Sequence, residues 1–249
     1  MALLRLKGTK TSVYRLKKVF KKKGIRYKSV RLKHRWRKEH DAKNKEKDER
    51  TFVKFREGVR NAMERGRALV WVDESIYNQR LCQRFAWSRK GDNMTPTTML
   101  HDEPSFAVVV AITAPQGLLH FRIRPKSFKT DDFLQFVKEL RNELGGGQFD
   151  LVLDNCTIHK TKKLKDYCKE HKVGLIYQVP YHPEQQCCEN FFAWSKEFFR
   201  RRILEQRLGK ETEILSLVSQ SILAVRRESI NEIIDKTTSR IIAQPGYNY

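Results

Sequence analysis

The chain has few cysteines and no long apolar run. Its 249 residues include five cysteines, an odd number, and no pair has the C-x-x-C spacing of a zinc knuckle or a redox motif. Because a disulfide framework needs paired cysteines and an oxidising compartment, we expect reduced thiols and no cysteine-based zinc module. No apolar stretch approaches the roughly 18–20 residues that a membrane-spanning helix needs, and we expect neither a signal peptide nor a membrane partner.

Acidic residues are scarce as well. The chain carries 51 Lys and Arg against 29 Asp and Glu, a formal net charge of +22. The imbalance is steepest in the first fifty residues, which contain 20 basic and 5 acidic side chains. Basic side chains release the counterions condensed on a nucleic acid, so this block predicts a nucleic-acid partner. A solvated basic tail is the alternative interpretation.

The pattern of apolar residues divides the chain into four parts, at residues 1–40, 41–66, 67–207 and 208–249. The first part is basic and contains one short amphipathic helix, and the last is a pair of helices. The second part reads as a charged helical linker. Its apolar stripe is formed by Phe52, Phe55, Val59 and Met63.

The third part predicts an α/β fold. Its strand-like runs are ALVWVD, LCQRFAWS, FAVVVAITA, LLHFRIR, LVLD and VGLIYQVP. Helical patterns lie between and after the later strands, at DDFLQFVKELRNE, KTKKLKDYCKEHK and from Glu189 to about Gln206. This order favours a mixed sheet covered by helices.

Two of these strands end on an aspartate. ALVWVD ends on Asp73 and LVLD on Asp154. Active sites of open α/β sheets gather at the carboxyl ends of the strands, so neighbouring strands would bring both carboxylates to one edge. Two adjacent carboxylates repel unless a cation lies between them, and Mg²⁺ prefers such oxygen ligands. An isolated Asp154-Asn155 is also typical of a turn.

A third acid would complete such a site. The strongest candidate is Glu189, which opens a helix whose aromatic residues can pack against the sheet. Glu184 lies in the preceding Pro-rich loop and is the weaker alternative. Taken alone, Glu189 reads as an acid favoured by the helix dipole.

At this point the sequence resembles a known family. The succession VDES, RFAWSRKG, LVLDNCTIHK, VPYHPEQQCCEN and a following W-x-K is similar to the mariner-type superfamily of DDE transposases, over roughly residues 9–205. The family motifs fall on Asp73, Asp154 and Glu189, with 34 residues between the last two. The resemblance implies a ribonuclease H-like fold, a mixed five-stranded sheet flanked by helices, with a basic helical N-terminal extension.

The resemblance also implies a mechanism. Asp73 would bridge two Mg²⁺ ions, with Asp154 on one and Glu189 on the other, and Mn²⁺ would be able to substitute. Water would cleave the DNA at the transposon end, and the freed 3′-hydroxyl would then attack target DNA. The implied partners are double-stranded DNA, both transposon ends and target, and a second copy of the chain. The implied location is the nucleus if the host is eukaryotic.

The sequence departs from the family pattern in two places. In the loop before the third acid, Val179 and His182 replace a proline and a serine, and Gln186-Cys187 replaces Asn-Pro. This loop positions Glu189, so we expect the change to alter the level of activity. Family members also carry two helix-turn-helix modules, of which residues 9–31 resemble only the last helix. We therefore expect a fragment, a split gene product or a shortened relative.

Six further residues are candidates for contact with DNA or with the metal-binding acids: Arg84, Lys90, Asn155, His159, Lys196 and Arg200. Each has a structural alternative. His159 could cap a helix, Asn155 could turn the chain, and Arg200 could sit on a solvated helix end.

Two other functions fit parts of the sequence. One is a domesticated or truncated DNA-binding protein without cutting activity, which would retain the acids. The other is a retroviral-type integrase, but His34 and His40 have no paired cysteines at zinc spacing.

Overall fold

The computed structural model describes residues 13–29, 36–78, 85–89, 104–180, 182–206 and 211–244. Contacts divide the chain into two compact units, one comprising residues 1–34 and 80–102, the other residues 35–79 and 103–249. No helix within the described residues has the length and apolar character needed to cross a membrane.

The smaller unit contains one helix and a two-stranded sheet. Helix α2 (Val13–Lys22) has its lysines exposed, and Gly24 follows it with a φ of 71°, which suits a residue without a β-carbon. Strand β1 (Ile25–Ser29) then pairs antiparallel with β3 (Phe85–Arg89). The expected strand around RFAWS is confirmed, but its expected place among the strands of the catalytic body is wrong. The sequence shows the strand pattern but not the partner, because pairing depends on residues far away in the chain.

The larger unit is built on a mixed five-stranded sheet, as expected. Its strands are β2 (Ala68–Tyr77), β4 (Phe106–Thr113), β5 (Gly117–Arg124), β6 (Phe149–Leu153) and β7 (Gly174–Tyr177), in the order β5-β4-β2-β6-β7. The first three pair antiparallel, whereas β6 runs parallel to both β2 and β7. Strands β2 and β6 are therefore neighbours, and their carboxyl ends lie at the same edge.

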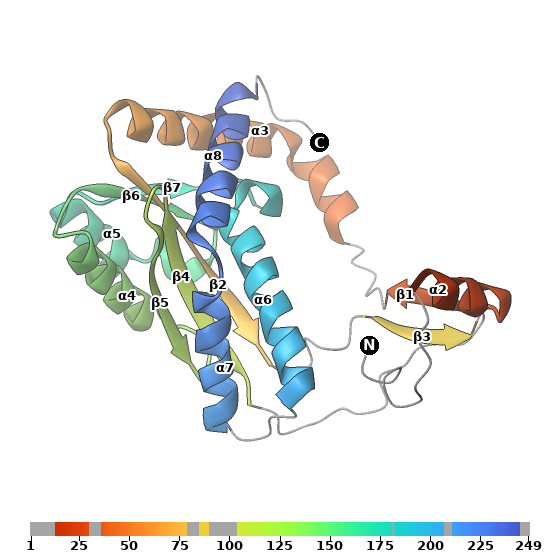
Figure 1. Ribbon diagram of the computed structural model, residues 1–249. Coiled ribbons are helices and arrows are strands. Elements are labelled where there is room, and N and C mark those ends of the chain that lie inside the picture. The colour runs from red at the N-terminus through yellow and green to blue at the C-terminus, as the bar shows by residue number, and fades with distance from the viewer. Residues whose placement is uncertain are drawn as a thin grey trace. The chain divides into compact units, whose positions relative to one another are not determined.

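Helices cover both faces of this sheet (Figure 1). They are α3 (Trp36–Glu64), α4 (Thr130–Glu143), α5 (Lys162–Glu170), α6 (Cys187–Gln206), α7 (Glu211–Leu223) and α8 (Arg227–Ala243). Val70 and Val72 of β2 pack into a core with α4 and α5, whereas α6 contacts the sheet at β2 and β4, and α8 at β4 and β5. The alternation of strand side chains between two buried faces explains why the runs are almost wholly apolar.

Helix α3 packs against β2, β7 and α8. Three residues of the expected stripe, Phe52, Phe55 and Val59, are buried as expected. Met63 is half exposed, and Ala62 is buried in its place. The buried stripe therefore shifts by one position in the last turn of the helix, which ends at Glu64.

Candidate active site

Three acids from three separate elements line one cavity of about 360 Å³. Asp73 lies within β2, Asp154 follows the last residue of β6, and Glu189 lies in the first turn of α6. The parallel pairing of β2 with β6 brings the two aspartates to one edge, as the sequence predicted. The expected end of the first strand at Asp73 is wrong, because β2 continues to Tyr77 through its pairing with β4. Helix α6 packs against β2 and adds the glutamate. The weaker candidate, Glu184, is exposed and does not line this cavity.

Asp73 is in an unfavourable place for a negative charge. Burial raises the pKa of its carboxyl well above the usual range, and repulsion from Glu74, Glu189 and Asp154 raises the pKa further. A hydrogen bond of 2.9 Å from the Glu74 N–H to Asp73 Oδ1 opposes this shift only in part. The charge of Asp73 therefore costs free energy in the isolated chain, and a cation in the cavity would offset that cost.

Asp154 is held by the residues that follow it. Its Oδ1 atom accepts a 2.9 Å hydrogen bond from the Cys156 N–H and lies 2.8 Å from His159 Nδ1. Burial raises the pKa of this carboxyl, but the contacts with His159, Cys156 and Lys160 outweigh burial and bring the pKa below its usual value. Asp154 is consequently ionised at neutral pH and fixed in direction.

His159 lies between two acids of the site. It lies in a short 3₁₀ helix, η2 (Thr157–Lys160), and is fully buried, with Nε2 3.0 Å from Glu74 Oε1. Burial lowers the pKa of the imidazole, but the contacts with Asp154 and Glu74 outweigh burial and raise the pKa to about 10. His159 is thus a cation between two carboxylates. The capping alternative is wrong for its side chain, which meets these acids.

Two contacts fix this imidazole in place. Its ring lies 4.3 Å from the ring of Phe133 on α4, centroid to centroid, and its backbone carbonyl accepts a hydrogen bond from the Tyr177 hydroxyl on β7. The sequence offered two partners for His159, DNA and the metal-binding acids. Because the side chain is fully buried and contacts Asp154, the packing fits the second of these.

The donors of the cavity fit a hard divalent cation. Three carboxylates in a half-buried cavity, with Asp73 destabilised by its neighbours, are the oxygen-rich and electron-rich set that Mg²⁺ or Mn²⁺ requires. Within the described residues, no three His, Cys, Asp or Glu side chains converge closely enough to hold an ion as they stand. The chemistry therefore fits, and the carboxylates would have to draw together around the cation.

The remaining predicted residues fall in different places. Asn155 lines the cavity; its side-chain amide donates to the Gln178 carbonyl and accepts from Lys160. Lys196 on α6 donates to the Ser75 hydroxyl and lies over the Tyr77 ring, beside β2 and not in the cavity lining. Arg84 and Lys90 lie outside the described residues.

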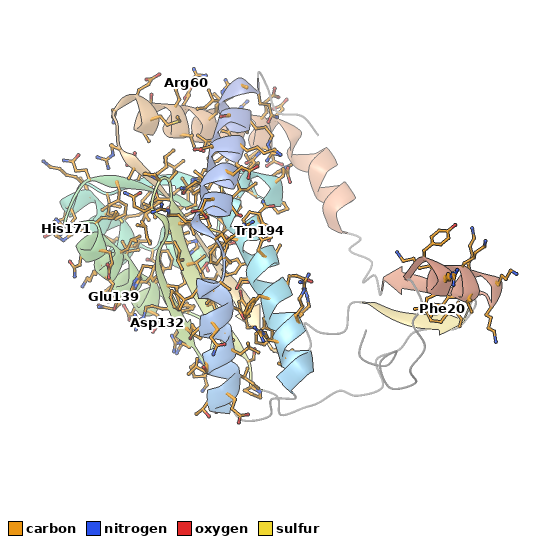
Figure 2. All side chains as sticks on the ribbon, viewed as in Figure 1. Phe20, Arg60, Asp132, Glu139, His171 and Trp194 are labelled. Atoms are coloured by element: carbon orange, nitrogen blue, oxygen red, sulfur yellow. The ribbon has the colours of Figure 1, made fainter. Side chains whose placement is uncertain are left out.

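The basic end of α6 lies away from the acids. Arg200 is paired with Glu197 three residues earlier, at 2.9 Å, and does not line the cavity. Trp194, at the family's tryptophan position, projects from α6 with 40% of its surface exposed (Figure 2).

The sequence assigns no role to Glu74 or Gln178, and it places Gln186 in the loop before Glu189 without a contact of its own. Glu74 directly follows Asp73 and pairs with His159. Gln178 and Gln186 line the cavity and make hydrogen bonds to the backbone. Their signal was their residue type: two glutamines in otherwise apolar, buried surroundings must find hydrogen-bond partners.

One protein family and several solved structures are similar to this chain. The family described as DDE superfamily endonuclease matches residues 68–208, more than half of the chain. No curated protein matches the chain in sequence. Solved structures do match. Mos1 transposase in a paired-end complex with the left transposon end has 15% identity and a TM-score of 0.63, covering 97% of this chain and 76% of that chain.

Two further Mos1 structures give the same result. The Mos1 catalytic domain with Raltegravir and Mn has 12% identity and a TM-score of 0.58, covering 83% of this chain and 98% of that chain. A pre-cleavage Mos1 transpososome has 12% identity and a TM-score of 0.63, covering 100% of this chain and 78% of that chain. At these identities the likeness establishes the fold, which is the ribonuclease H-like fold of that catalytic domain.

Proposed function

The chain belongs to the DDE superfamily of endonucleases, and we propose that it is a mariner-type transposase. In this proposal it cuts DNA at transposon ends and joins the freed 3′-hydroxyl to target DNA. The observation that supports the proposal most is the cavity at the edge of the sheet, where Asp73, Asp154 and Glu189 meet from β2, β6 and α6. Neither step needs a covalent intermediate with the protein, and no nucleophilic side chain is assigned to one.

Each residue has a defined task in this proposal. Asp73, Asp154 and Glu189 hold the divalent cations. Bound there, the cations would supply charge stabilisation to the phosphate as the P–O bond is exchanged. His159 keeps Asp154 turned toward the cavity by its 2.8 Å contact, and Glu74 balances the imidazolium from the other side. Asn155 ties the end of β6 to the end of β7 through the Gln178 carbonyl.

We propose double-stranded DNA as the substrate. The net charge of +22 and the exposed lysines of α2 suit a polyanion. The Mos1 structures are named as complexes with a transposon end and as a transpososome, which supports the same class of partner here. Because a transposon has two ends, we further propose that two copies of the chain act together.

The second candidate is a DNA-binding protein that does not cut. It is favoured by one observation, that the three acids in the described structure do not converge as a ready-made ion site. The two functions share DNA binding and differ in cleavage alone, so a cleavage assay separates them.

The test is nicking of supercoiled plasmid by the purified chain with Mg²⁺, with Mn²⁺ or with EDTA. We expect nicking with either metal and none with EDTA. The substitutions Asp73→Asn, Asp154→Asn and Glu189→Gln should each reduce the rate at least a thousandfold, by the order of several kcal/mol that metal clamping contributes, while leaving DNA binding intact. Glu184→Gln should nick normally. Metal-independent nicking, or normal nicking by any of the three acid variants, would overturn the proposal.

A further inference from the structure

The side-chain amide of Gln186 joins the backbone segments that carry two of the acids. Gln186 is only 2% exposed and precedes the first residue of α6. Its Nε2 atom donates to the Val72 carbonyl at 3.2 Å, and its Oε1 atom accepts from the Cys188 N–H at 3.3 Å. Val72 directly precedes Asp73, and Cys188 directly precedes Glu189. One side chain thus connects β2 and α6 one residue away from each acid.

Gln186 also occupies the position that begins the helix. Its backbone is extended, with φ of −110° and ψ of 112°, and its carbonyl accepts the Glu189 N–H at 3.3 Å. The first N–H groups of a helix lack partners within the helix and are commonly met by the side chain at this position. Gln186 therefore accepts hydrogen bonds from the N–H groups of both Cys188 and Glu189. The position of the first turn of α6 depends on these two bonds.

The other end of this bridge, at Val72, lies just beyond the last residues at which β2 pairs with β6. The parallel register between β2 and β6 ends at Trp71 and Val152, one residue before the Val72 carbonyl. Beyond that point lie Asp73 and Asp154, which line the cavity. Gln186 provides the Val72 carbonyl with a donor there, which an apolar side chain of similar size cannot do.

A second glutamine, Gln178, connects the same loop to the segment that carries Asp154. Gln178 donates its backbone N–H to the Leu153 carbonyl at 3.0 Å, next to Asp154, and its side chain donates to the Gln185 carbonyl at 3.1 Å. Hydrogen bonds therefore run from the end of β6 through Gln178 and the 3₁₀ helix η3 (Pro183–Gln185) to Gln186 and β2. The loop that differs from the family motif is anchored at both ends.

We infer that Gln186 is a positioning residue, which sets Glu189 and Asp73 at the separation from which they can close on a shared metal ion. The inference rests on the proposed function, since it concerns the same site. The role requires a side chain at position 186 that donates one hydrogen bond and accepts another. The amide of glutamine does both, whereas methionine does neither. The neighbouring Gln185 provides a contrast: it is also buried, yet its Oε1 atom has no hydrogen-bond partner in the described part of the chain.

The test compares Gln186→Met with Gln185→Met in the full chain. Mn²⁺ binding is measured by the electron paramagnetic resonance of free Mn²⁺, and nicking of supercoiled DNA is measured as a function of Mn²⁺ concentration. Amide hydrogen exchange of the first turn of α6 is measured in the metal-free proteins. We expect Gln186→Met to weaken Mn²⁺ binding and raise the half-activating concentration by about tenfold or more, the order found when a partner of a metal ligand is removed. Exchange at Cys188 and Glu189 should also be faster, and Gln185→Met should match the original protein in all three measurements.

The outcomes separate the inference from the proposed function. If the original chain neither binds Mn²⁺ nor nicks DNA, the proposed function is wrong. If the original chain does both and Gln186→Met behaves like Gln185→Met, the role of Gln186 alone is wrong. Should Gln186→Met fail to fold, Gln186→Asn retains an acceptor for Cys188 but is one methylene too short to reach Val72. It must then show the weakened Mn²⁺ binding with an ordinary melting temperature, and normal binding by this variant overturns the inference.

Discussion

The imidazole of His159 lies 3.0 Å from the carboxylate of Glu74, although the two residues are 85 positions apart in the chain. The same ring lies 2.8 Å from Asp154, so one buried cation is shared by carboxylates from β2 and from the end of β6. The single positive charge of the imidazolium offsets one of these two negative charges in the metal-free chain. The other two acids, Asp73 and Glu189, belong to the elements that Gln186 connects.

Replacing His159 with alanine should destabilise the protein. The substitution leaves Glu74 and Asp154 without their cation and removes the contact with Phe133, so we expect a loss of about 2–3 kcal/mol in the free energy of unfolding, the range for hydrogen bonds to charged groups. Urea denaturation at pH 7 measures this loss. Combining His159→Ala with Glu74→Gln should recover part of it, because one unpaired carboxylate is gone.

The control for this prediction is His171→Ala. His171 lies at the end of α5 and contacts the ring of Tyr167 at the surface, so its loss should change the free energy of unfolding by about 0.5 kcal/mol or less. Equal losses for the two histidine variants would show that the contacts of His159 with the acids contribute nothing to stability.

Replacing Asp73 with asparagine should stabilise the metal-free protein. Burial and three neighbouring carboxylates disfavour the charge of Asp73, and a raised pKa of an acid means that ionisation destabilises the folded state at neutral pH. Asparagine removes the charge and retains an acceptor for the Glu74 N–H. In EDTA at pH 7 we expect a melting temperature a few degrees above that of the original chain, at about 2–4 °C per kcal/mol.

Added metal should reverse this order. Mn²⁺ should raise the melting temperature of the original chain, because a ligand that binds only the folded state stabilises it, and should leave Asp73→Asn almost unchanged. Calorimetry with and without Mn²⁺ gives both values. A lower melting temperature for Asp73→Asn in EDTA would contradict the electrostatic description of the cavity.

The cysteines should differ sharply in their reactivity. Cys156 is exposed two residues after Asp154, whereas burial raises the pKa of the Cys168 thiol to about 11 and of the Cys187 thiol to about 12. The thiolate is the reactive form, so at pH 8 fewer than about one in a hundred of the buried thiols is ionised. Iodoacetamide should label Cys156 far faster than Cys168, Cys187 or Cys188, as measured by peptide mass spectrometry.

Labelling of Cys156 should also inhibit nicking, because the adduct stands beside the acids. The Cys156→Ser variant should nick DNA at the normal rate. Iodoacetamide should inhibit this variant less than the original chain, because residue 156 can no longer be labelled. Labelling of Cys168 at the same rate as Cys156 would show that α5 does not pack as described.

Much of this site could be predicted from the sequence because the signal was local. An apolar run that ends on a carboxylate shows both a buried strand and a polar edge, and this placed Asp73 and Asp154 together. The mixed sheet followed from the order of the runs, and its five strands from the family resemblance. The position of RFAWS did not, because a strand pattern is the same whether its partner is β1 or the main sheet.

The contacts that hold the acids could not be predicted in the same way. Gln185 and Gln186 are adjacent and chemically identical, and only the path of the loop decides which amide meets the Val72 carbonyl. The pairing of His159 with Glu74 likewise depends on where a 3₁₀ turn places one ring. Such contacts are long-range consequences of packing and leave no periodic pattern in the chain.

The account depends on Asp73, Asp154 and Glu189 acting together on divalent metal. Crystals of the chain soaked in Mn²⁺ and measured at the manganese absorption edge test this most directly. We predict anomalous peaks in the cavity between β2, β6 and α6, with carboxylate oxygens of all three residues about 2.0–2.4 Å from manganese, as oxygen ligands of hard cations are. Peaks elsewhere with this cavity vacant, or a manganese ion that Glu189 does not reach, would contradict the account.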